Sequence, residues 1–139
     1  SNQSGCTGAA ISRRGVGETV FSINLVFPHW FTSRYAAFSD REEHLPVDQH
    51  LLIALQAPRP VLVLSAAEDG WSDPEGEFLG ALHAEPVYTL VGEPGLGTDQ
   101  WPDIGPYVGG PLGYHLRDGG HTVDATAWAV FADYADEFL

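Results

Sequence analysis

The clearest hydrophobic pattern in the chain is the unbroken apolar run 61–64, which lies inside the segment 59–65. A strand that is covered on both faces of a parallel sheet has such a run, whereas a half-exposed strand alternates apolar and polar residues. The pattern therefore predicts a buried parallel strand over residues 59–65.

Weaker patterns on either side of this strand predict the remaining elements. We expect a short helix within 18–31 that gives way to a loop at Pro28, a helix over 46–55, a helix from Pro74 to about residue 84 with Asp73 as its N-cap, extended segments over 87–91 and 113–117, and a final helix over 125–138. Residues 1–17 and 92–111 are rich in glycine with serine or proline, and predict loops. Helices that alternate with strands indicate an α/β fold with a parallel sheet.

The predicted strands are too few for a complete domain. Two strands do not form a stable sheet with both faces covered. The chain also contains no methionine, and it opens on Ser1 without the features of a signal peptide. We therefore interpret residues 1–139 as part of one α/β domain, and we expect further strands upstream.

Composition and charge exclude several function classes. The net charge is −13 with no lysine, so the surface repels nucleic acid and anionic membranes. No apolar run approaches the roughly 18 residues that a membrane-spanning helix needs. The single cysteine, Cys6, excludes an internal disulfide and a cysteine-based zinc site, and the histidines lack the spacing of a zinc protease. We predict no metal site and no cofactor.

Candidate chemistry follows the two clearest strands. Glu68 and Asp69 come after the first, and His121 comes after the second, just before the last helix. An acid followed by a histidine is the chain order of the α/β-hydrolase triad, in which the acid orients the imidazole and the imidazole moves the proton. The alternative is that the acid forms a turn or caps a helix, a role that suits Asp73 better, and that His121 is an ordinary loop residue.

The nucleophile of such a triad is absent from the sequence. No G-x-S-x-G motif occurs, and neither Ser4 nor Ser65 fits the strand–turn–helix pattern that the nucleophile elbow needs. We expect the serine to lie outside this chain, and the chain alone to be inactive as an esterase.

Several motifs, taken together and in order, resemble bacterial glucuronoyl esterases over nearly the whole chain. They are SNQSGC with GAA at 1–10, FPHWF at 27–31, LPVDQHLL at 45–52, APRPVLV at 57–63, WSDP at 71–74, and GYHLR through GH at 113–121. The resemblance implies the C-terminal portion of an α/β-hydrolase three-layer sandwich. It also implies a secreted or periplasmic serine esterase that cleaves the ester between 4-O-methyl-glucuronic acid of xylan and lignin alcohols. The partners would be a glucuronoxylan or lignin–carbohydrate ester substrate and the N-terminal part of the same domain.

The resemblance also implies roles for individual residues. His121 looks like the catalytic base, Asp69 like the acid, Trp71 like an aromatic that packs on the sugar, and Glu18 like a carboxylate that binds uronate hydroxyls. Many members place a catalytic Glu in the stretch matching 1–5, where this chain has Gln3; the acid role therefore shifts to Asp69, with Glu68 as the weaker candidate. Trp71 could instead be a core residue, and Glu18 a first-turn helix residue.

Other functions remain open at this stage. A non-catalytic carbohydrate-binding relative would keep the sugar pocket without the nucleophile, and another α/β-hydrolase such as an acetyl-xylan esterase would share the acid and histidine. The family's Gly-x-Ser-Arg motif, which carries the nucleophile and an oxyanion arginine, would distinguish these possibilities, but it does not occur in this sequence.

Overall fold

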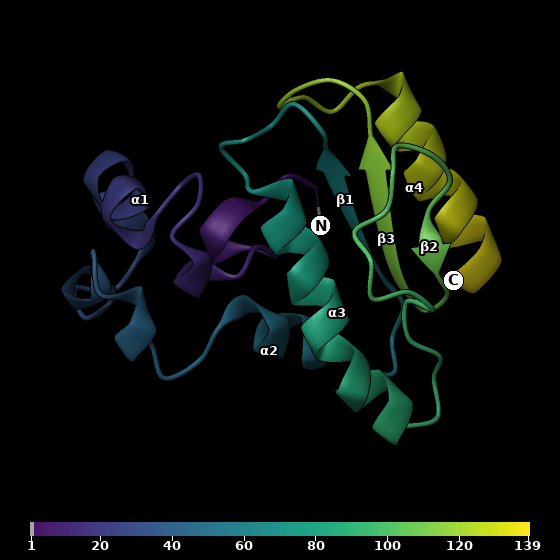
Figure 1. Ribbon diagram of the computed structural model, residues 1–139, viewed down its shortest axis with the longest axis horizontal. Helices are drawn as coiled ribbons and strands as arrows, with labels where there is room; N and C mark the ends of the chain where they lie inside the picture. Colours follow the sequence, from purple (N-terminus) through teal and green to yellow (C-terminus); the bar gives the residue numbers. More distant parts are fainter. Residues whose placement is uncertain (1) are drawn as a thin grey trace.

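The computed structural model describes residues 2–139 (Figure 1). Ser1 lies outside the described residues, so the predicted N-terminal loop is described from residue 2. The helices and strands are α1 (Val20–Val26), α2 (Gln49–Ala54), β1 (Val61–Ala66), α3 (Pro74–Leu90), β2 (Val108–Gly109), β3 (Leu112–Arg117) and α4 (Ala125–Phe138), and short 3-10 turns occupy much of the first 45 residues.

The sheet has the order β1-β3-β2. β1 and β3 run parallel, from the pair Val61 and Leu112 to the pair Ala66 and Arg117, which confirms the predicted parallel pairing. The short β2 lies inside the predicted 92–111 loop and pairs antiparallel with β3, so the sheet is mixed. Asn2 forms a further parallel bridge with Leu64 of β1.

Helices cover both faces of the sheet, so the molecule has the three layers that were expected (Figure 1). On one face, the Tyr114 hydroxyl donates to the Pro74 carbonyl of α3 at 2.9 Å, and its ring packs edge-on against Phe78. Its neighbour Gly113 lies against the ring of Tyr134 in α4. Successive residues of a strand point to opposite faces, so α3 and α4 lie on opposite sides.

One predicted strand is wrong. Residues 87–91 were expected to be extended, but α3 continues through Pro86 to Leu90. The reason is tertiary: Tyr88 is fully buried, and its hydroxyl donates to the Arg59 carbonyl at 2.8 Å. Packing of this side chain outweighs the missing backbone donor of Pro86.

Two predicted helices are shorter than expected because of their caps. The helix expected over 46–55 begins only at Gln49, whose backbone N–H donates to the side chain of Asp48. The helix expected from residue 18 begins at Val20, after the N-cap Thr19, and ends at Val26. Pro28 then starts a separate 3-10 turn, Pro28–Trp30.

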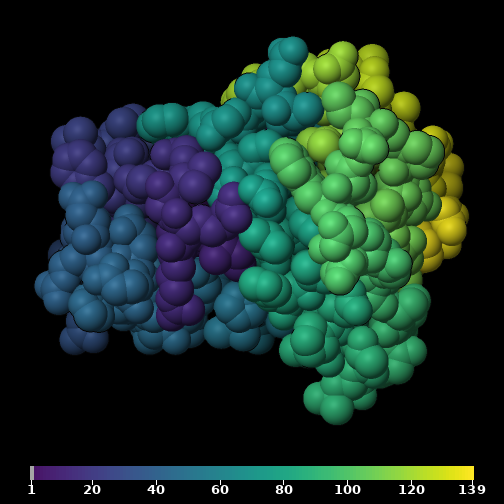
Figure 2. Space-filling model, in the orientation of Figure 1, coloured from purple at the N-terminus to yellow at the C-terminus, as the bar shows by residue number. Residues whose placement is uncertain are grey.

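The N-terminal and C-terminal segments occupy different sides of the molecule. Figure 2 shows the purple and blue N-terminal segments on one side and the green and yellow C-terminal segments on the other. Helix α2 packs against α3, which connects the two sides. Within residues 2–139, no helix combines the length and apolar character that crossing a membrane requires.

Candidate active site

Asp69 is held in a tight turn directly after β1. Its backbone N–H donates to the Ala66 carbonyl at 3.1 Å, and its Oδ1 accepts from the Ser72 backbone N–H at 3.3 Å. Helix α3 then begins at Pro74, with the Asp73 side chain accepting from the Gly76 N–H as the predicted N-cap. Asp73 is thus the capping residue, and the buried carboxylate of Asp69 is free to serve another partner.

That partner is His121. β1 and β3 end at the same level, with Ala66 paired to Arg117, so the loops that follow them meet at one edge of the sheet. His121 Nδ1 lies 2.7 Å from Asp69 Oδ2. An ionised carboxylate can only accept, so Nδ1 carries the proton and Nε2 keeps its lone pair. The His121 side chain is 64% exposed, which leaves Nε2 open to a reactant.

Glu68, the weaker candidate for the acid, has a different environment. Its side chain is exposed, and its backbone N–H donates to the Gly119 carbonyl at 3.0 Å. The structure therefore brings Asp69, rather than Glu68, to the imidazole.

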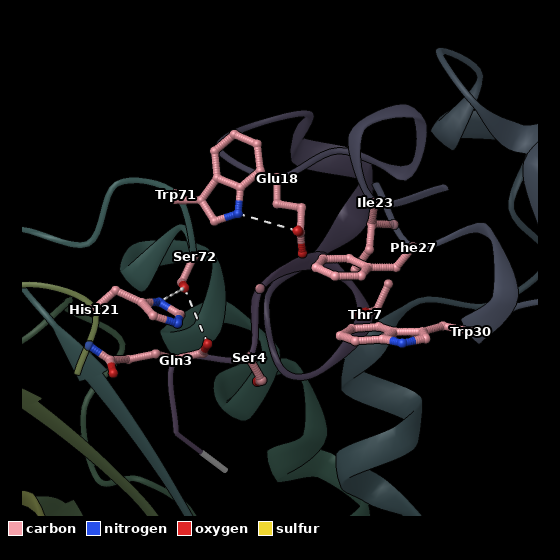
Figure 3. A pocket seen from close by; sticks show the side chains of 11 residues that line it. Gln3, Ser4, Thr7, Glu18, Ile23, Phe27, Trp30, Trp71, Ser72 and His121 are labelled. Carbon is pink, nitrogen blue, oxygen red and sulfur yellow. Dashed lines mark hydrogen bonds between the residues drawn. The ribbon is translucent and has the colours of Figure 1, made fainter. Parts of the chain in front are cut away.

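A cavity of about 590 Å³ opens beside His121 (Figure 3). Its lining comes from the N-terminal segment, α1 and both strand-end loops: Gln3, Ser4, Gly5, Thr7, Glu18, Ile23, Phe27, Trp30, Trp71, Ser72 and His121. Figure 3 shows His121 and Ser72 at one end of the cavity and the stacked rings of Phe27 and Trp30 at the other. These two rings lie 4.1 Å apart and within 10° of parallel.

Glu18 and Trp71 meet on the rim of this cavity. The Trp71 indole Nε1 donates to Glu18 Oε1 at 3.2 Å, and the Glu18 backbone N–H donates to the Trp71 carbonyl at 2.7 Å. Gly17 permits this approach: its φ is +66°, and a Cβ there would collide with the Trp71 carbonyl oxygen. Partial burial raises the pKa of Glu18, against the opposing effects of the Trp71 hydrogen bond and the nearby His121.

The open alternatives for these two residues do not fit the structure. Trp71 is exposed rather than part of the core. Glu18 precedes the N-cap Thr19, so it lies outside the first turn of α1. Both side chains line the same cavity as His121.

Gln3 and Ser72 complete the surroundings of the imidazole. The buried Gln3 side chain donates from Nε2 to the Gly120 carbonyl at 2.8 Å. The Ser72 hydroxyl donates to the Gln3 carbonyl at 3.2 Å and lies 3.4 Å from His121 Nδ1. Sequence patterns did not identify Ser72 as a site residue. Its position three residues after Asp69 could have indicated it, because a backbone N–H at that spacing can donate to the carboxylate of the turn, as that of Ser72 does.

The arrangement can supply general base and general acid chemistry. A histidine that is oriented by a buried carboxylate takes a proton at Nε2 and returns it to a leaving group. No group of three or more potential ligand side chains that could hold a metal ion occurs in the part of the chain that the structure describes, residues 2–139.

Comparison with known proteins finds similar esterases. The family described as fungal glucuronyl esterase matches residues 2–92. A curated carbohydrate esterase of an unknown prokaryotic organism is 54% identical over the whole chain. The structure of a promiscuous esterase of family CE15 from a marine bacterial metagenome is 54% identical, with a TM-score of 0.97 over 100% of this chain. The glucuronoyl esterase from Solibacter usitatus is 47% identical, with a TM-score of 0.92 over 99% of this chain.

The match extends over only part of those proteins. The chain spans 32% of the curated relative and 35% of each of the two solved structures. Since the family match nevertheless covers most of this sequence, the chain belongs to the glucuronoyl esterases of carbohydrate esterase family 15.

Proposed function

We propose that residues 1–139 are the C-terminal part of one α/β-hydrolase catalytic domain that cleaves the ester between 4-O-methyl-glucuronic acid of xylan and a lignin alcohol. The observation that carries the proposal is the 2.7 Å contact between Asp69 and His121, beside a cavity that Glu18 and Trp71 also line. The proposed base and the proposed sugar-binding residues thus line one cavity, and the proposed acid lies buried behind the base.

In the proposed mechanism His121 acts first as a base. Its Nε2 takes the proton of a serine hydroxyl while the serine oxygen attacks the uronoyl carbonyl. The resulting imidazolium gives that proton to the departing alcohol, and an acyl-enzyme remains. Water then attacks the acyl-enzyme while His121 takes its proton, and the imidazolium returns that proton to the serine oxygen as the ester bond to the serine breaks. The product is the free uronic acid, still attached to xylan. Asp69 holds the Nδ1 proton and stabilises the imidazolium without taking the proton itself.

Glu18 and Trp71 are the proposed binding residues. The Glu18 carboxylate accepts from ring hydroxyls, and the exposed face of Trp71 packs against the sugar ring. The hydrogen bond between them fixes both side chains before the substrate arrives, which lowers the entropy cost of binding.

We assign the nucleophile to a part of the esterase domain outside this chain. Ser65 is fully buried and donates to Glu77, and Ser72 lies on the Nδ1 side of the imidazole, away from Nε2. The chain alone should therefore not turn over an ester. The polymeric substrate indicates that the whole esterase acts outside the cell or in the periplasm.

The test is hydrolysis of benzyl glucuronate by the full-length esterase, with an acetylated xylan and a simple alkyl acetate as comparison substrates. We expect the glucuronate ester to be the best substrate, and His121→Ala to abolish turnover. Preference for the acetyl esters would favour an acetyl-xylan esterase. Binding of glucuronoxylan without hydrolysis of any ester would favour a carbohydrate-binding protein.

A further inference from the structure

Two side chains from distant parts of the chain converge on the carbonyl oxygen just before His121. Gln3 Nε2 donates to the Gly120 carbonyl at 2.8 Å, and Arg117 Nη2 donates to the same oxygen at 2.7 Å. A carbonyl oxygen has two lone pairs, so both acceptor positions of Gly120 are occupied. The carbonyl shares one rigid peptide plane with the nitrogen and Cα of His121. The hydrogen bonds from Gln3 and Arg117 therefore fix the position of the His121 Cα, from which the side chain extends.

Arg117 holds the loop on both sides of His121. Besides Gly120, its guanidinium donates to the Asp118 carbonyl at 2.6 Å and to the Thr122 carbonyl at 2.5 Å. The side chain is buried, and its charge is balanced by Asp124, 3.7 Å away. A planar guanidinium with several donors can bridge carbonyls in this way, whereas a lysine presents a single ammonium.

The loop needs such external support. Gly119 and Gly120 precede His121; Gly119 has a φ of +83°, and both residues are flexible in the absence of restraints. The largely exposed His121 ring cannot be held by packing. A displacement of about 1 Å at a catalytic group can lower the rate about 100-fold, so the hydrogen bonds from Gln3 and Arg117 bear directly on turnover.

The chemistry at position 3 requires a donor. A carboxylate in place of the Gln3 amide would place an acceptor against the Gly120 carbonyl, which is also an acceptor. We infer that Gln3 and Arg117 are positioning residues for the catalytic histidine and act together as a clamp on the Gly120 carbonyl. This inference rests on the proposed function, because it assigns the clamp a role in the turnover that His121 performs.

The experiment compares Gln3→Met, Gln3→Glu and Arg117→Lys in the full-length esterase, with kcat and KM measured on benzyl glucuronate. For Gln3→Met we expect kcat to fall about 10- to 100-fold with KM within about twofold, the effect of a displaced base. Gln3→Glu should be slower than Gln3→Met, although it is closer in shape to glutamine. Arg117→Lys should lose at least as much.

Gln49→Met is the matched control, because the Gln49 amide also donates to a backbone carbonyl, that of Cys6 at 2.8 Å, and Gln49 does not line the cavity or contact the His121 loop. It should keep the wild-type kcat. If Gln3→Met stays within twofold of wild type, or loses no more kcat than Gln49→Met does, the clamp is wrong. If Arg117→Lys fails to fold, the kcat values of the two Gln3 variants still test whether the clamp positions His121.

A second readout separates this inference from the proposed substrate. A fluorophosphonate probe reacts with a histidine-activated serine whatever the natural ester is, so its labelling rate should fall in the Gln3 variants as kcat does. Wild-type labelling without glucuronate hydrolysis would overturn the proposed substrate, and the variants would still test the clamp. A wild-type enzyme that reacts with neither would overturn the catalytic role of His121 and the clamp together.

Discussion

Asp69 and Glu77 are both buried carboxylates near the same end of β1, but their partners differ. Asp69 faces an exposed ring: one oxygen lies 2.7 Å from Nδ1 of the His121 imidazole. Glu77, in α3, faces fixed donors. It accepts from the Ser65 hydroxyl at 2.6 Å, from the Ser4 backbone N–H at 2.6 Å and from the Ser4 hydroxyl at 3.2 Å. Burial raises the pKa of Glu77 to about 7, although these hydrogen bonds lower it.

The difference shows that burial alone does not identify a catalytic acid. Both side chains lie out of solvent, and the one with a raised pKa, Glu77, does not contact the imidazole. Its hydrogen bonds tie the N-terminal segment and β1 to α3, so we interpret it as a structural anchor. The chemistry of the partner distinguishes Asp69. Both carboxylates contact a residue that lines the cavity, but the partner of Asp69 is a histidine that can transfer a proton, whereas Ser4 donates to Glu77 through its backbone N–H and hydroxyl.

The largest effect is expected on kcat, for substitutions of Asp69 and its partner His121. In the full-length esterase, Asp69→Asn and His121→Ala should each lower kcat by about 10⁴-fold, because an asparagine favours the wrong imidazole tautomer and an alanine removes the base. Steady-state kinetics on benzyl glucuronate measure this. Glu68→Gln, at the exposed neighbouring carboxylate, is the control and should keep wild-type kcat. An Asp69→Asn enzyme that retains a tenth of the wild-type kcat would refute the acid assignment.

The next effect concerns stability rather than turnover. Glu77→Met leaves the buried Ser65 hydroxyl without its acceptor, and such a group costs about 1–3 kcal/mol. We therefore expect the free energy of unfolding, from urea titration of the full-length protein, to fall by at least that amount. The kcat of the molecules that remain folded should change far less than in Asp69→Asn. Unchanged stability would mean that Glu77 is not an anchor.

The pH dependence of stability should follow Glu77. Its pKa is raised from 4.5 to about 7 in the folded state, so between these values the folded protein binds the proton and the unfolded protein does not. The contribution of Glu77 to the free energy of unfolding is fully present below pH 4.5 and is lost as pH rises to about 7. Over this range the free energy of unfolding falls by at most about 1.4 kcal/mol per pH unit. Urea titrations across this range should show a less negative slope for Glu77→Gln than for wild type. Equal slopes would contradict the assignment.

The smallest effect is expected at a third carboxylate, Glu18, which faces the cavity directly. Glu18→Gln weakens hydrogen bonds that a charged acceptor strengthens, by about 1 kcal/mol, so KM for benzyl glucuronate should rise about fivefold with kcat nearly unchanged. KM for an alkyl acetate, which lacks ring hydroxyls, should not move. A similar rise for both esters would mean that Glu18 shapes the cavity without contacting the sugar.

Local patterns predicted the parts of the molecule that local physics determines. The apolar run 61–64 became β1, and Asp73 became the N-cap of α3. The meeting of the segments that carry Glu68, Asp69 and His121 followed from one general rule, that parallel strands end at the same edge, whereas the choice of Asp69 over Glu68 came through the family resemblance. The residues next to Tyr88 in the sequence do not indicate that its side chain is buried, so an extended segment was predicted where α3 continues. That Glu18 and Trp71 serve one pocket was expected only through the family resemblance, and their mutual hydrogen bond was not expected, because no periodicity links residues so far apart.

The hydrogen bond from Gln3 to Gly120 joins residues 117 positions apart, and this span has a consequence for the order of folding. The entropy cost of closing a loop grows with its length, so contacts within β1, α3 and β3 should form before the N-terminal segment docks on the His121 loop. A partly folded molecule would then hold its sheet without an aligned histidine. In hydrogen exchange at rising denaturant, the Gln3 backbone amide, which donates to the Leu64 carbonyl, should lose protection before the amides of β1 and β3, and catalytic competence would be the last property gained on folding.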